Sequence, residues 1–274
     1  MRASAARVLA GVAGILIAIV AEAGTLELEG TVTQGALIIG RTDPGTRVAL
    51  DGEPVGVSGD GVFLLGFGRD APAKARLDLV FPDGSRSHRD LAVAQRQYRV
   101  QRVDGLPPKT VTPSEKDMVR IRKEIAEVKL ARKRNDARED FLAGFAWPLK
   151  GRISGVYGSQ RILNGKPRRP HFGVDIAAPT GTIVRAPADG VVTLANSDMF
   201  FSGGTLIVDH GHGLSSTFMH LSAILVEDGQ RVRQGDTIAK VGATGRASGP
   251  HLHWGMNLFE TRLDPQLVVA PMAP

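Results

Sequence analysis

The stretch HFGVDIAAPTGTIVRAPADG, residues 171–190, decides the fold class of the C-terminal half of this chain. Its β-branched run Thr182-Ile183-Val184 lies between Pro and Gly turns. Similar runs follow along the chain, with turns about every 8–12 residues, as in antiparallel sheets. These runs are Val191–Leu194, Thr205–Val208, Ser216–Phe218, Arg231–Val232, Thr237–Val241 and His251–Met256. We therefore predict a mainly β protein whose C-terminal antiparallel β-barrel or sandwich domain spans residues 146–274.

Histidines are concentrated in this domain, since six of the seven lie between residues 171 and 253. His171 and Asp175 share the quoted stretch, while His251 and His253 alternate along a predicted strand and therefore point to the same side. The chain has no cysteine, so a transition-metal site must use imidazoles and carboxylates. A catalytic zinc takes three such ligands and keeps one open position, and a His, Asp and His set supplies them.

Three further histidines lie nearby in the sequence. His220 follows a predicted strand and adds an imidazole that can line the site. His210 and His212 are separated and followed by glycines, which indicate a tight hairpin turn. We interpret both as turn residues, with His210 a weaker candidate for lining the site.

Several ordered motifs of this domain resemble the lysostaphin-type, or LytM-like, zinc endopeptidases. Besides residues 171–190 they are GGTLIVDHG (203–211), FMHLS (218–222), GDTIA (235–239), GATG (242–245) and GPHLHW (249–254). The resemblance covers roughly residues 147–268, under half of the chain. Two departures are Phe218, where the family often has Tyr, and Trp254, where Phe or Tyr is common. Both bear on substrate fit more than on the metal.

The resemblance implies a compact antiparallel β fold with a narrow groove and one Zn²⁺ per chain. It assigns His171, Asp175 and His253 as the metal ligands. It places His220 and His251 beside the metal-bound water and the substrate carbonyl as catalytic residues, and leaves open which of the two is the general base. The substrate that it implies is the peptide cross-link of bacterial peptidoglycan.

Residues 24–105 read as a small β-sandwich-like domain. Predicted strands lie at Thr25–Thr33, Arg47–Leu50, Gly61–Leu65, Ala75–Phe81 and Tyr98–Val103, and Asp51-Gly52 is a hairpin signal. The lone histidine of this domain, His88, lies among polar residues and is interpreted as a surface residue.

Residues 106–145 are predicted to be a linker followed by a charged helix. The linker, residues 106–113, contains three prolines. Residues 114–140 lack Gly and Pro, and Met118, Ile121, Ile125 and Val128 form a narrow apolar stripe at helical spacing. We interpret this helix as a connector docked on a neighbouring domain, with a partner-binding or substrate-gating helix as the alternative.

Residues 1–23 resemble a secretion signal, with Arg2 and Arg7 before an apolar run and small residues at Ala21 and Ala23. We expect export across the inner membrane to the periplasm or cell envelope. An uncleaved membrane anchor is the alternative, and the membrane is a partner only in that case.

The net charge of +6 suits an anionic wall polymer. Basic clusters and stacking aromatics do not combine as in nucleic-acid binders, so we expect no nucleic-acid partner.

Three hypotheses of function follow. The first is a zinc-dependent endopeptidase that cleaves peptidoglycan cross-links. The second is a catalytically silent LytM-like regulator of other cell-wall hydrolases, which would have other cell-wall enzymes or regulators as partners. Such regulators lack zinc ligands, whereas this chain has all three ligands and both accessory histidines. The third is a wall-binding module in which residues 24–104 carry the function.

Overall fold

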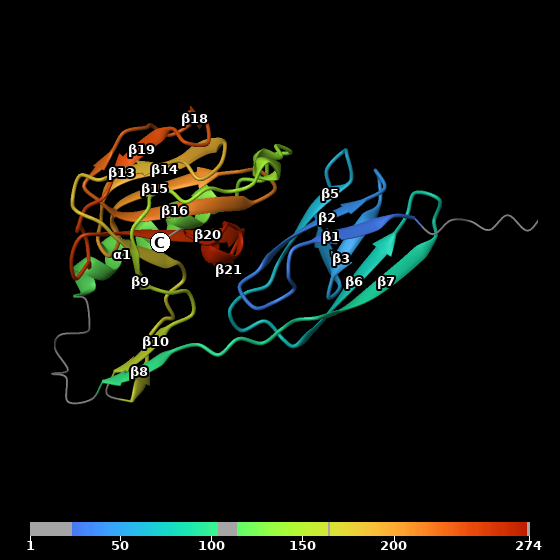
Figure 1. Cartoon of the computed structure of the whole chain (residues 1–274), viewed down its shortest axis with the longest axis horizontal. Coiled ribbons are helices and arrows are strands. Elements are labelled where there is room, and N and C mark those ends of the chain that lie inside the picture. Colours follow the sequence, from blue (N-terminus) through green and yellow to red (C-terminus); the bar gives the residue numbers. More distant parts are fainter. Residues whose placement is uncertain (1–23, 104–113, 164, 273–274) are drawn as a thin grey trace, which may run out of the picture.

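The computed structural model describes residues 24–103, 114–163 and 165–272, which form two bodies (Figure 1). An N-terminal module, made of strands β1 to β7, lies on the right of the view. A larger C-terminal domain lies on the left together with helix α1. The chain is mainly β, as predicted. The predicted signal segment, residues 1–23, and the linker, residues 106–113, lie outside the described residues.

The N-terminal module consists of two antiparallel sheets, with strand orders β1-β2-β5 and β4-β3-β6-β7. Their apolar side chains meet in one core, to which β6 contributes the alternating residues Ala75, Leu77 and Leu79. Asp51 and Gly52 both have positive φ and close the predicted hairpin between β3 and β4. The strands are β1 (Leu26–Glu29), β2 (Leu37–Thr42), β3 (Arg47–Leu50), β4 (Glu53–Val55), β5 (Val62–Gly66), β6 (Lys74–Val80) and β7 (Arg86–Ala92).

Strands β2 and β7 are absent from the sequence-based expectation. The first five residues of β7 are all exposed because it is the edge strand of its sheet, so no alternation of polar and apolar residues reveals it. In β2 the run is interrupted by Gly40, against which the ring of Phe63 packs where a Cβ would otherwise lie. Tertiary packing therefore accounts for both omissions.

Helix α1 (Glu115–Arg132) begins at a capping box in which Ser114 accepts from the Asp117 backbone N–H and the Asp117 carboxylate accepts from the Ser114 N–H. The expectation of a helix through residue 140 is wrong, because the chain leaves the helix at Lys133. Of the predicted stripe, Ile121 is buried, whereas Ile125 is 51% exposed. Within the described ranges, no helix is long and apolar enough to cross a membrane.

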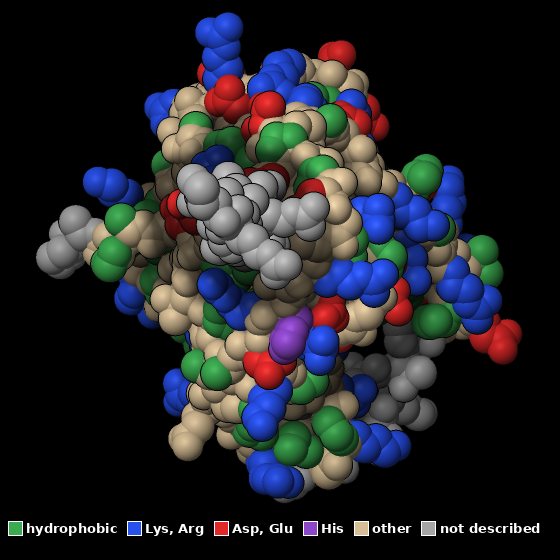
Figure 2. All heavy atoms as spheres, turned by 90° about the vertical axis from the view of Figure 1, so that its right-hand side faces the viewer, with side chains coloured by type: hydrophobic (Ala, Val, Ile, Leu, Met, Phe, Trp, Pro, Cys, Tyr) green, Lys and Arg blue, Asp and Glu red, His purple; other side chains and the backbone are tan. Residues whose placement is uncertain are grey.

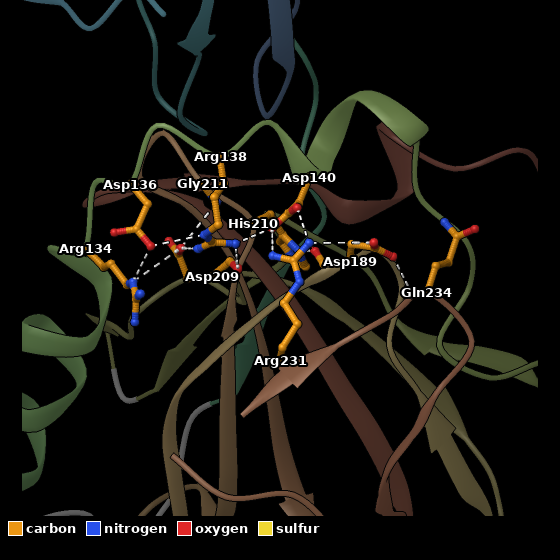
Figure 3. A network of polar contacts seen from close by, with 10 residues as sticks. All are labelled: Arg134, Asp136, Arg138, Asp140, Asp189, Asp209, His210, Gly211, Arg231 and Gln234. Carbon is orange, nitrogen blue, oxygen red and sulfur yellow. Dashed lines mark hydrogen bonds and ion pairs between the residues drawn. The ribbon is translucent and has the colours of Figure 1, made fainter. Parts of the chain in front are cut away.

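Ion pairs replace helical hydrogen bonds in the segment after α1. Arg138 pairs with Asp140 and with Asp209, and Arg134 pairs with Asp136 at 2.7 Å (Figure 3). The backbone of the same segment receives a hydrogen bond, from His212 N–H to Asp136 O, 2.9 Å. These contacts hold the segment across the turn between β15 (Gly203–Asp209) and β16 (Leu214–Leu221). This is why its charged sequence, although free of Gly and Pro, is not helical.

The C-terminal domain has an eight-stranded antiparallel sheet, with order β18-β14-β15-β16-β20-β12-β9 and β21 paired to β20, and a three-stranded sheet β13-β19-β17. Side chains of both sheets share one core. The elements are η2 (Asp140–Ala143), β9 (Arg152–Gly155), β12 (Val174–Ala177), β13 (Ile183–Arg185), β14 (Gly190–Met199), β15 (Gly203–Asp209), β16 (Leu214–Leu221), β17 (Ala223–Ile224), β18 (Arg231–Val232), β19 (Thr237–Lys240), β20 (His251–Leu258), β21 (Thr261–Leu263) and η3 (Pro265–Leu267).

The large sheet has one face toward the core and one outer face. Leu252, Trp254 and Met256 of β20 are core residues, so the alternate residues His251 and His253 lie on the outer face. Helix α1 covers part of this outer face, on the side of β14 and β15. The metal-ligand candidates and the helix therefore share one side of the sheet.

Two kinds of contact join the bodies. Strand β8 (Val100–Val103) pairs in parallel with β10 (Gln160–Leu163), which also pairs with β11 (Lys166–Pro167). In addition, Arg96 pairs with the buried Asp264 at 2.8 Å, and Leu37 and Leu64 of the N-terminal module join the core cluster of the C-terminal domain.

Candidate metal centre

Two neighbouring strands build the cluster that the sequence analysis predicted. Asp175 on β12 lies directly opposite His253 on β20, and His171 lies just before β12. Three distances of 2.9 Å form a triangle: His171 Nε2 to Asp175 Oδ1, His171 Nε2 to His253 Nδ1, and His253 Nδ1 to Asp175 Oδ1. The three side chains thus present one nitrogen, one oxygen and one nitrogen to a common point, as a metal site requires.

The hydrogen bonds of His171 test whether a metal fits here. Its Nδ1 lies 3.0 Å from Val156 O, and because a carbonyl can only accept, Nδ1 must carry the proton. In the neutral ring, Nε2 then presents a lone pair toward the Asp175 carboxylate. A metal ion placed between them would satisfy both lone pairs. Ligand distances of about 2.0–2.2 Å are usual for zinc with N and O donors, and a triangle of this size admits an ion at that reach.

The pKa shifts of Asp175, His171 and His253 are those expected for a carboxylate and imidazoles packed closely together. Burial opposes ionisation of Asp175, but hydrogen bonds and charge from His171 and His253 outweigh it, so the pKa of Asp175 is well below its usual range. Burial lowers the pKa of His253 to about 4, which keeps its ring neutral at pH 7 and available as a ligand. The His171 pKa is raised because Asp175 outweighs the effect of burial.

His220 and His251 lie next to the triangle. Their ring centroids are 4.8 Å apart, and the His220 ring is 6.4 Å from that of His253. His220 Nδ1 donates to Thr244 O and His251 Nδ1 donates to Gly249 O, both at 2.8 Å. In the neutral rings both Nε2 atoms are therefore free to accept a proton. Burial lowers the pKa of His220, which favours this neutral form.

Glycines close to the ligand candidates are site residues that sequence reasoning missed. A Cβ at Gly155 would overlap Asp175 Oδ2, and one at Gly173 would lie 2.7 Å from His253 Nε2. Only glycine lets the backbone at these positions approach the ligand candidates this closely. Gly173, inside the quoted stretch between two ligands, was the one signal that could have indicated this.

The loop that carries His171 is supported from the N-terminal module. Gly158 N–H donates to His171 O and His171 N–H donates to Ser159 O, both at 2.8 Å. On its other side, Gly158 O accepts from Arg69 Nε at 2.8 Å. A side chain of the first body thus contacts the backbone that positions a metal-ligand candidate.

The remaining histidines lie elsewhere. His210 is fully buried on the core side of the sheet, where Nδ1 bonds to Asp189 O and Nε2 to Ser216 Oγ. It does not line the cluster. His212 occupies the turn with a positive φ, in line with its interpretation as a turn residue. His88 is exposed on β7.

Comparisons with known proteins point to one family. Residues 169–265 match the family model of peptidase family M23, and this range contains all five candidate site residues. A crystal structure titled as a putative peptidase M23 from Pseudomonas aeruginosa superposes with a TM-score of 0.65 at 30% identity, covering 87% of this chain and 95% of that one.

Curated relatives match the C-terminal part. Peptidoglycan DD-endopeptidase ShyA of Vibrio cholerae is 36% identical over 125 residues, which are 45% of this chain and 29% of ShyA. DD-carboxypeptidase/endopeptidase Mpg of Neisseria meningitidis is 41% identical over 120 residues, 44% of this chain and 27% of Mpg. The matched region therefore spans less than a third of the length of these relatives.

Proposed function

We propose, since the chain belongs to peptidase family M23, that it is a zinc-dependent endopeptidase which hydrolyses peptide cross-links of bacterial peptidoglycan. The observation that carries the proposal is the 2.9 Å triangle of His171, Asp175 and His253, with two further imidazoles beside it. We further propose that these three residues are the zinc ligands and that His220 and His251 are the catalytic residues.

When bound, a zinc ion lowers the pKa of water to about 7 and polarises a carbonyl oxygen. The chain supplies the proton transfers. With Nδ1 protonated by its bond to a backbone carbonyl, either His220 or His251 can accept the proton of the attacking water at Nε2 and later donate it to the leaving amine. The second imidazole, once protonated, can stabilise the negative charge that develops on the carbonyl oxygen.

Peptidoglycan is the substrate class favoured by the names of the relatives, which include two DD-endopeptidases of Vibrio cholerae. A cell-envelope location follows from that substrate and is part of the same proposal. The regulatory alternative requires a site unable to hold zinc. The complete donor set, with the tautomer of His171 arranged for a cation, favours the enzyme.

The test is digestion of purified, cross-linked peptidoglycan by the full chain, with the released muropeptides separated by chromatography. We expect cross-linked dimers to disappear in the presence of zinc, to persist after a chelator is added, and to disappear again when zinc is restored. Persistence of the dimers at saturating zinc would contradict the enzyme and favour the regulator.

A further inference from the structure

The small sheet β11-β10-β8 forms a basic arm, which we define as residues 96–103 and 156–170. In Figure 1 this sheet lies below the C-terminal domain, apart from the main body of both units. The arm contains no Asp or Glu, although the whole chain has 28 acidic residues among 274. Its basic residues are Arg96, Arg99, Arg102, Arg161, Lys166, Arg168 and Arg169. The charge of the arm is therefore of one sign.

Among the described residues, acidic side chains do not neutralise most of this positive charge. The one ion pair of the arm there joins Arg96 to Asp264. Arg99, Arg102 and Lys166 are exposed. The face seen in Figure 2, at the N-terminal module, differs because acidic side chains lie among the basic ones. A surface of uncompensated charge attracts an oppositely charged polymer and concentrates it locally.

The arm leads directly to the metal centre. Arg169 precedes His171 by two positions, and its guanidinium carbon lies 5.5 Å from the ring centre of Phe172. Its charge also acts on a buried neighbour. The pKa of Arg262 is lowered to about 10, first by burial and then by the positive charge of Arg169. An anionic chain bound along the arm would therefore end beside the residues that hold the metal.

We propose that the basic arm binds the free carboxylates of peptidoglycan stem peptides and so holds the wall polymer beside the metal centre. This inference rests on the proposed function, because it names the surface that captures the same substrate. A wall polymer is favoured over an anionic membrane by the side chains of the arm. Both aromatic rings of the arm, Tyr98 and Tyr157, are packed inward, with Tyr98 under Arg69 and Tyr157 2% exposed, so neither anchors a bilayer.

The test compares two triple variants of the full chain. The arm variant, Arg99→Gln, Arg102→Gln and Lys166→Gln, removes three exposed charges and leaves Arg96 and Arg169 in their contacts. The control variant, Arg47→Gln, Arg86→Gln and Arg89→Gln, removes three exposed charges from the N-terminal module. Both are sedimented with sacculi freed of phosphate polymers, in the presence of a chelator so that nothing is cleaved.

We expect the arm variant to bind sacculi about tenfold more weakly, as three screened contacts allow, and the control variant to bind within twofold of the unmodified chain. Amidation of the sacculus carboxylates should weaken binding of the unmodified chain to the same degree. Its binding should also weaken as salt rises. Melting curves establish that each variant is folded. If the triple arm variant does not fold, Lys166→Gln alone replaces it, and a smaller loss of binding to sacculi is then expected.

Equal binding by the arm variant and the unmodified chain would overturn the inference, as would undiminished binding of the unmodified chain to amidated sacculi. Arm-dependent sedimentation with phosphatidylglycerol vesicles but arm-independent binding to sacculi would assign the arm to a membrane instead. Sedimentation needs no hydrolysis, so the two proposals can fail separately. If the chain bound sacculi through the arm but never cleaved peptidoglycan, the proposed enzyme would be contradicted and the inference about the arm would stand.

Discussion

Asp175 in the metal cluster and Asp209 in the ion-pair network of Figure 3 are both carboxylates with little exposure, 22% and 2% for their side chains. Asp209 is surrounded by arginines of the same chain: Arg138 contacts it directly and Arg134 lies 3.9 Å away. The partners of Asp175 among the described residues are histidines: His171 and His253 each lie 2.9 Å from its Oδ1, and His251 lies 3.8 Å away.

The difference separates a structural ion-pair cluster from the proposed metal site. The network contains its own cations, Arg134, Arg138 and Arg231, and it ties the segment after α1 to the sheet. The metal cluster has one carboxylate, and its partners among the described residues are imidazoles with no Lys or Arg, so we expect it to bind a cation from outside the chain. Changes in the network should therefore affect stability, and changes in the cluster should affect metal binding.

The largest effect is expected for His253→Ala. Loss of this nitrogen leaves two donors, so bound zinc should fall from about one per chain to near zero and muropeptide cleavage by more than roughly a thousandfold. Metal content by mass spectrometry and cleavage of cross-linked dimers measure the two quantities. A variant that kept full zinc content would refute the ligand assignment.

His251→Ala should distinguish the metal ligands from the proton-transfer groups. We expect zinc content to be unchanged and cleavage to fall about 10²–10⁴-fold, because the free Nε2 acceptor is lost while the triangle remains. His88→Ala, at the exposed histidine of β7, is the matched control and should be as active as the unmodified chain. If zinc were lost along with activity, His251 would be a ligand rather than a catalytic residue.

Arg138→Ala should show the opposite pattern. Removing this guanidinium leaves Asp209 buried without its nearest cation, so the free energy of unfolding should fall by about 3 kcal/mol while zinc content is retained. Arg76→Ala, which breaks the exposed pair with Asp78, is the control and should leave the free energy of unfolding almost unchanged. Denaturant titration measures both. Loss of zinc from a folded Arg138 variant would mean that the two regions are not independent.

The smallest effect concerns pH and the buried His210. Burial lowers its pKa from 6.5 to about 4, so the unfolded chain binds the proton more tightly than the folded one. The stability from this group is complete above pH 6.5 and is lost as pH falls toward 4. Between pH 7.5 and 5, the metal-free unmodified chain should lose about 2 kcal/mol more than His210→Gln. Parallel pH dependences of the two proteins would show that His210 is not the group responsible.

Local patterns were sufficient for much of the fold. Alternating β-branched runs predicted the mainly β class, and Asp51-Gly52 predicted a hairpin that the structure contains, because both depend on near neighbours in the chain. Strands β2 and β7 and the end of α1 were not predictable in this way. Each depends on a distant partner: Phe63 over Gly40, the edge position of β7, and Asp209 beside Arg138.

The same division applies to the site. The sequence by itself determined which residue types are available, because a chain without cysteine that places six histidines between residues 171 and 253 has few other ways to bind zinc. Only the tertiary structure decided how they act. It paired Asp175 with His253 across two strands and brought Val156 O to His171 Nδ1, which sets the tautomer. It also folded the basic arm beside His171. Such arrangements depend on register and backbone contacts between distant segments, which local sequence does not encode.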